Sequence, residues 1–233
     1  MSIAGTLAMT PEEFLRVRPL PSGAGWMSCR FSPQGLRDLP RRMPPGCLLI
    51  LEDSIPPENT DPERIADQLR QVLTSFRCCG LLLDFQQENN PDCRMLSQYL
   101  PGVLPCSVGV SQLYAGEGDC PVFLSLLPPH QSLEAAVAPW KGRELWLEIG
   151  PAPEKILLTA EGSVYLPVPS PLPPCPREDS RLCCHYGIRV REDRAEFFLR
   201  RDPNDLRRLL RQGEALGVTR YAGLYRELGQ LLF

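Results

Sequence analysis

The residues of this sequence that are best placed for chemistry follow a short apolar run. In GLLLDFQQENN, residues 80–90, the run ends at Asp84, and Gln86 follows two positions later. A polar cluster at the exit of a buried strand is typical of a binding or catalytic pocket. Gln86 can donate and accept hydrogen bonds, but its amide does not titrate. The pair therefore predicts a polar pocket in which Gln86 cannot act as an acid.

Alternation along the strand predicts which of these side chains share a face. Leu82, Asp84 and Gln86 have one parity, and the residues between them have the other: Leu81, Leu83 and Phe85. On a barrel strand one parity faces the interior and the other packs against helices. We therefore expect Asp84 and Gln86 to face the pocket.

Two glutamates could supply the titratable proton that Gln86 cannot. Glu148 lies near the end of ELWLEI (144–149), at the kind of position where barrels carry functional groups, whereas Glu88 lies in a loop-like stretch. A lone strand glutamate can equally face outward or form an ion pair. Gln112 ends the run at 106–112 and Tyr114 follows it; they could line a binding site by hydrogen bonding and stacking, or form a strand-end turn.

Successive apolar runs along the chain indicate the strands that must position these residues. The runs suit parallel strands covered by helices, and they lie at 26–31, 47–52, 80–85, 106–112, 121–127 and 144–149. Thr60 and Glu63 predict a capping box for a helix with Pro62 in its first turn. Weaker helices are expected at 91–100 and 131–140. The alternation predicts an α/β barrel or open sheet.

Several segments depart from that alternation. Only eight residues separate the strands at 106–112 and 121–127, too few for a crossover helix. Hairpins are expected at 155–167 and 186–200, and a Pro-rich extended loop at 167–176. We interpret residues 1–233 as one domain, a small, irregular (β/α) TIM-like barrel with a missing helix and added β-hairpins.

The C-terminal segment predicts one clear helix and one ambiguous element. Asp202 is the expected cap, Pro203 lies in the first turn, and Gly217 ends the helix. Residues 218–229 satisfy both strand and helix spacing, so the sequence leaves both open.

Two segments resemble chitinase-type glycoside hydrolases, nearest to the spore cell-wall branch. The segment at 80–86 is similar to their fourth-strand pattern DGxDxDxE, with Cys79, Leu82 and Gln86 where that family has Asp, Asp and the catalytic Glu. The segment at 202–229 is similar to their closing helix and strand. Leu224 or Tyr225 would there replace a pocket-floor tryptophan.

The resemblance implies a glycosidase-like barrel whose general acid has been replaced. It implies a non-catalytic or strongly impaired protein that binds an N-acetylhexosamine-containing glycan or a peptidoglycan-like ligand. Its expected binding residues are Asp84, Gln86, Gln112, Tyr114 and Tyr225. Two alternatives remain open: an interaction protein whose loops contact a protein partner, and an active hydrolase that uses Glu148 or Glu88 as its acid.

Composition and motifs argue against other classes. A net charge of −3 gives no basic surface for nucleic acid or an anionic membrane. The N-terminus lacks a secretion signal, so we expect a cytoplasmic protein with reduced cysteines. The sequence contains no phosphate-binding glycine pattern, so we expect no phosphate-containing cofactor. Adjacent cysteines point apart in an extended chain, so we expect no metal site from the following group: Cys175, Cys183, Cys184 and His185.

Overall fold

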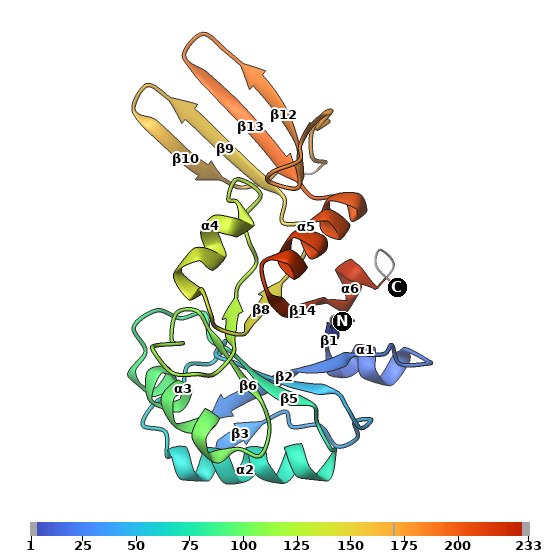
Figure 1. Cartoon of the computed structure of the whole chain (residues 1–233), viewed down its shortest axis with the longest axis vertical. Coiled ribbons are helices and arrows are strands. Elements are labelled where there is room, and N and C mark those ends of the chain that lie inside the picture. Colours follow the sequence, from blue (N-terminus) through green and yellow to red (C-terminus); the bar gives the residue numbers. More distant parts are fainter. Residues whose placement is uncertain (1–3, 170, 230–233) are drawn as a thin grey trace.

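A closed barrel of parallel strands forms the centre of the molecule (Figure 1). The computed structural model describes residues 4–169 and 171–229. Within these, the eight barrel strands in order of pairing are β1 (Ala4–Met9), β2 (Ala24–Ser32), β4 (Leu48–Glu52), β5 (Gly80–Asp84), β6 (Val108–Ser111), β7 (Val122–Leu124), β8 (Leu145–Glu148) and β14 (Val218–Leu224). Parallel pairing of β14 with β1 closes the ring. The prediction of a small TIM-like barrel is confirmed.

Helices cover the outer wall of this barrel unevenly. They are α1 (Pro11–Arg16), α2 (Pro62–Ser75), α3 (Pro91–Val103), α4 (Leu133–Val137) with the 3-10 turn η1 (Ala138–Trp140), α5 (Pro203–Ala215) and α6 (Tyr225–Leu228). Among the described residues, no helix combines the length and the apolar character that crossing a bilayer requires.

The predicted start of α2 is wrong by one residue. Asp61, not Thr60, accepts the backbone N–H groups of Glu63 and Arg64, so the capping box is not formed. The backbone N–H of Thr60 instead donates to Asp92 at 3.1 Å. At α5 the expected cap is confirmed, because Asp202 accepts from Asn204 and Asp205.

Two connections of the barrel lack a helix. Residues 112–121 join β6 to β7 through turns, as the short spacing predicts. The second gap was not predicted: β2 runs into the antiparallel strand β3 (Gly35–Arg37), and an irregular segment then leads to β4. The connection from β2 to β4 therefore contributes no helix to the outer wall of the barrel.

The two expected hairpins combine into one antiparallel sheet of five strands, inserted between β8 and α5. Its order is β10 (Gly162–Leu166), β9 (Glu154–Thr159), β13 (Arg194–Arg200), β12 (Cys184–Val190) and β11 (Arg177–Asp179). Figure 1 shows this sheet projecting from one end of the molecule, with α4 and α5 between it and the barrel strands. The described residues of the Pro-rich loop pack back on the sheet, where the carbonyl of Pro174 lies 2.4 Å from an ideal Cβ built at Gly187.

The first and last strands of the barrel could not be assigned from the sequence. The segment at 4–9 forms β1, a strand that was not predicted. Residues 218–229 are first a strand, β14, and then the short helix α6, so each open alternative describes one part.

Apolar side chains on the two faces of the barrel form separate clusters. The interior cluster includes Leu82, Phe123 and Trp146. The larger outer cluster lies between strands and helices, and its members from β5 and the following residue are Leu81, Leu83 and Phe85. The alternation predicted for this strand is confirmed.

Candidate functional site

Carboxylates from three strand ends meet at the mouth of the barrel. Glu52, Asp84 and Glu148 end β4, β5 and β8, and all three line one small cavity. The cavity has a volume of about 40 Å³, and its other walls are Ala8, Met27, Ile50, Leu82, Phe123, Ala222, Gly223 and Leu224. In a parallel barrel the carboxyl ends of the strands all open on one side, so these residues converge although they are far apart in the chain.

Gln86 lies beside Asp84, as the alternation predicts, but its side chain is exposed. Its amide nitrogen donates a hydrogen bond to Asp84 and lies 3.4 Å from the hydroxyl of Ser125. The amide nitrogen carries hydrogen-bond donors and no titratable proton. It therefore stabilises the charged form of Asp84 without adding a second charge.

Glu148 is the most perturbed carboxyl of the mouth. Burial, followed by the nearby charge of Asp84, raises its pKa to about 7. The backbone N–H of Leu126 donates to Glu148 at 2.9 Å and opposes that shift, whereas Glu227 adds to it. Burial also raises the pKa of Asp84, and the hydrogen bond from Gln86 opposes that increase. Two coupled carboxyls of which one holds a proton near neutral pH can act as an acid and a base.

Asp53 and Tyr114 shape the loop that follows β5. The buried carboxylate of Asp53 accepts from the backbone N–H groups of Gln86 and Gln87, at 3.0 and 2.9 Å. The Tyr114 hydroxyl contacts the carbonyl of Gln87 and accepts from the N–H of Asn90 at 3.1 Å. Tyr114 thus holds this loop, and it is absent from the residues that line the mouth cavity.

The remaining predicted residues do not reach the cavity. Gln112 and Glu88 are exposed, at the end of β6 and in the loop after β5. Tyr225 begins α6 and packs against the outer core, whereas its neighbour Leu224 lines the cavity. The structure thus brings together Asp84, Gln86 and Glu148, and it separates Tyr114 and Tyr225 from them.

Sequence reasoning missed Glu52 and Asp53 at this mouth. Glu52 ends the buried run at 47–52 and Asp53 follows it, much as Asp84 comes at the end of its own apolar run, and the ladder pairs Glu52 with Asp84. That repeated strand-exit pattern was the available signal. Glu52 is also bound by the side chain of Arg30 from β2, so its charge is compensated.

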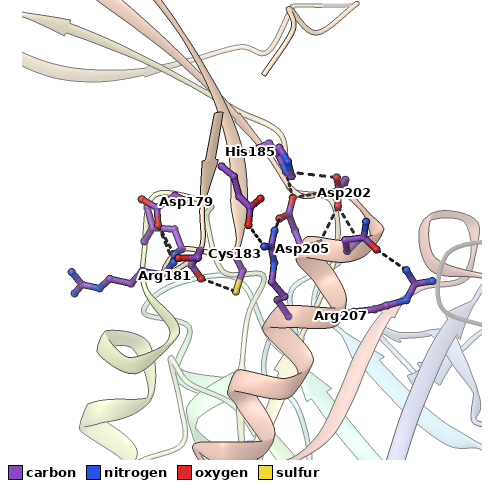
Figure 2. Close-up of polar contacts among 12 residues, drawn as sticks. Asp179, Arg181, Cys183, His185, Asp202, Asp205 and Arg207 are labelled. Carbon is purple, nitrogen blue, oxygen red and sulfur yellow. Dashed lines mark hydrogen bonds and ion pairs between the residues drawn. The ribbon is translucent and has the colours of Figure 1, made fainter. Parts of the chain in front are cut away.

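The Cys/His segment before α5 forms a structural anchor. Figure 2 shows His185 directed at Asp202 and Asp205, with Cys183 apart from them. His185 Nδ1 lies 2.7 Å from Asp205 and 3.6 Å from Asp202. Ligand atoms of these three residues lie within 4.8 Å of one another, the one such group found in the described ranges. The two carboxylates already accept backbone N–H groups of the α5 cap, and Arg208 contacts Asp205. The arrangement of His185, Asp202 and Asp205 therefore suits the start of a helix better than the binding of a cation.

Comparison with known proteins reveals similarity of fold. No family model matches the sequence, and no curated protein matches it. The spore cortex-lytic enzyme SleL of Bacillus cereus superposes with a TM-score of 0.54 at 9% identity, over 99% of this chain and 72% of that one. A chitinase of Chromobacterium violaceum ATCC 12472 superposes with a TM-score of 0.52 at 9% identity, over 95% of this chain and 93% of that one. The chain therefore shares its barrel fold with these two enzymes.

Proposed function

We propose that this chain is a glycoside-hydrolase-like barrel that is non-catalytic or strongly impaired. The observation that carries the proposal is Gln86, which lies at the strand exit beside Asp84 and donates its amide to that carboxylate. The resemblance implies a glutamate at this position as the general acid. General acid catalysis contributes about 10² to 10⁴ in rate, and an amide has no proton to transfer.

The size of the mouth cavity supports the same proposal. Its volume is about 40 Å³, whereas pockets for small ligands have volumes of roughly 300–1,000 Å³. One water molecule occupies about 30 Å³ in the liquid, so this cavity accommodates water and no sugar ring. A bound N-acetylhexosamine-containing glycan would therefore contact exposed amides at the rim, for which we propose Gln86 and Gln112.

Calorimetry and a turnover assay together test this proposal. We expect no hydrolysis of an aryl N-acetylglucosaminide above the buffer rate, and weak, millimolar binding of N-acetylglucosamine oligomers. Gln86→Ala should weaken that binding about threefold through loss of one rim hydrogen bond. Gln71→Ala, an exposed change on α2, is the matched control. Absence of heat with folded protein at millimolar oligomer would remove the glycan ligand, and turnover by the unmodified chain would remove the non-catalytic assignment.

A specific observation favours a second candidate function, hydrolysis with Glu148 as the acid. Its pKa of about 7, beside Asp84, resembles the arrangement in which one carboxyl protonates a leaving group and another stays ionised. If the chain hydrolyses the aryl glycoside, this candidate requires that Glu148→Gln abolish the rate and that Glu88→Gln leave it unchanged. An unchanged rate in Glu148→Gln would exclude Glu148.

A further inference from the structure

A large cavity lies away from the barrel mouth. It has a volume of about 910 Å³ and lies between α1 and the segment that leads from β3 to β4. Phe14 and Trp26 belong to its apolar wall, with ring centroids 5.3 Å apart. Met43 closes the other side, and Leu15 stands at the edge with 75% of its surface exposed. We call this feature the α1 groove.

The α1 groove lies beside a barrel connection that contains no helix. The connection from β2 to β4 contains the short strand β3 and no helix, and α1 has only six residues. Elsewhere α2 and α3, of 14 and 13 residues, cover the wall. An amphipathic helix covers such a wall by burying one apolar stripe. The recess beside this helix-free connection is therefore of the apolar kind that such a stripe can fill.

The rim of the α1 groove is positively charged, although the whole chain carries a net charge of −3. Arg18, Arg41 and Arg42 line the groove and are exposed. Within residues 4–169 and 171–229, neither Arg41 nor Arg42 has a hydrogen-bond or ion-pair partner. The acidic residue of the lining, Asp38, lies 3.6 Å from Arg37. Complementary charge across an interface selects the partner and accelerates its approach.

The guanidinium of Arg18 is held in position at this rim. It donates to the backbone carbonyl of Phe14 at 2.8 Å and also to that of Val17. Aromatic and arginine side chains beside an apolar recess are the usual anchors of helix-in-groove recognition.

We infer that the α1 groove binds an acidic amphipathic helix of a partner protein. Its apolar stripe, with residues at positions i, i+3, i+4 and i+7, packs on Phe14, Leu15 and Trp26. Its flanking carboxylates face Arg41 and Arg42. This binding surface is separate from the barrel mouth, so it stands whether or not the mouth binds glycans.

Selection from a defined peptide library tests this inference. The library displays 18-residue helices with a constant leucine stripe and with Glu, Lys or Gln at every other position, and it is selected against the intact chain. We expect the recovered helices to be rich in Glu, to bind with micromolar Kd by fluorescence anisotropy, and to weaken as salt is raised.

Paired variants locate the binding surface. Arg41→Glu with Arg42→Glu should weaken the recovered helices about tenfold or more, because two attractive charges become repulsive. Leu15→Asp should weaken them similarly. The matched controls are Arg64→Glu with Arg94→Glu on α2 and α3, and Val190→Asp, whose side chain is 78% exposed on the inserted sheet. All substituted side chains are exposed, so circular dichroism should show an unchanged fold.

Several outcomes would overturn the inference. They are a library that yields no helix, one enriched in Lys, binding that tolerates the arginine reversal, and binding lost in Val190→Asp but kept in Leu15→Asp. Sedimentation velocity supplies a further one. A dimer of this chain that Leu15→Asp dissociates would assign the α1 groove to a second copy.

Discussion

At the scale of single residues, the barrel mouth balances three carboxylates with limited compensation. Glu52 has Arg30, and Asp84 has the amide of Gln86. Glu148 has the backbone N–H of Leu126 and no cation in contact among the described residues. A buried carboxyl with one hydrogen bond and acidic neighbours retains its proton to higher pH. Glu148 therefore makes the mouth sensitive to pH near neutrality.

Glu148 predicts a loss of stability as pH rises. Its pKa in the folded protein is about 7, above the ordinary value of 4.5, so the folded state binds more protons between these values. The contribution is fully present below about pH 4.5 and disappears as the pH rises through 7. Urea unfolding should show Glu148→Gln equal to the unmodified chain at pH 4 and more stable at pH 8 by about 3 kcal/mol.

An exposed glutamate provides the control for this measurement. Glu58→Gln, in the loop before α2, should leave the pH dependence of the unfolding free energy unchanged. Parallel stability profiles of Glu148→Gln and the unmodified chain across pH 5 to 8 would contradict the assignment of the shift to Glu148.

At the scale of elements, the inserted sheet is joined to the barrel by side chains at the base of the sheet. His130, in the loop after β7, lies 2.7 Å from Glu154 of β9 and 3.0 Å from the hydroxyl of Tyr165 of β10. Arg201, next to β13, is 3% exposed and contacts the carbonyl of Leu127, and it lies 3.3 Å from that of Pro128. These contacts join the insertion to the loop between β7 and α4.

Arg201 should be the stronger of two neighbouring arginines in this connection. Arg201→Ala removes donors from one buried and one partly buried carbonyl and leaves them unpaired, which should lower the free energy of unfolding by about 2–4 kcal/mol. Arg200→Ala, at the adjacent exposed position, should change it by less than about 0.5 kcal/mol. Urea denaturation of both variants measures the difference, and equal effects would show that Arg201 does not anchor the insertion.

At the scale of the whole molecule, barrel closure places one large side chain across the interior. Trp146 from β8 is 2% exposed, and the guanidinium of Arg220 from β14 lies 4.6 Å from its ring centroid. An ideal Cβ at Gly109 of β6 would lie 2.3 Å from this indole. A glycine on β6 is therefore what allows the tryptophan to fill the barrel.

This packing predicts energetic coupling between Gly109 and Trp146, which are distant in the sequence but in contact inside the barrel. Gly109→Ala should cost about 2–3 kcal/mol of unfolding free energy, because the methyl group displaces the indole. Combined with Trp146→Leu, its cost should fall by about 1–2 kcal/mol, since the smaller side chain leaves room. Gly102→Ala in α3, where a Cβ meets no atom within 4 Å, is the control. Strict additivity in the double-mutant cycle would contradict this packing.

The sequence by itself determined the features that depend on neighbouring residues. Alternation placed Leu82 and Asp84 on the inner face and Phe85 on the outer one, because successive strand residues point to opposite sides. Pro203 with Asp202 marked the start of α5, and the short spacing after β6 excluded a helix there. Local rules did not detect β1, because its six residues form a strand by pairing with β14 and β2.

Only the tertiary structure decided which groups meet. Glu52, Asp84 and Glu148 converge because ring closure brings the ends of separated strands to one mouth, and no local pattern encodes that distance. The mouth cavity is small, and Tyr114 contacts the carbonyl of Gln87 in the loop after β5 instead of lining that cavity. The connection from β2 to β4 has no helix, and the α1 groove lies between that connection and α1. Periodicity and capping act over a few residues, whereas convergence depends on strand pairing across the whole chain.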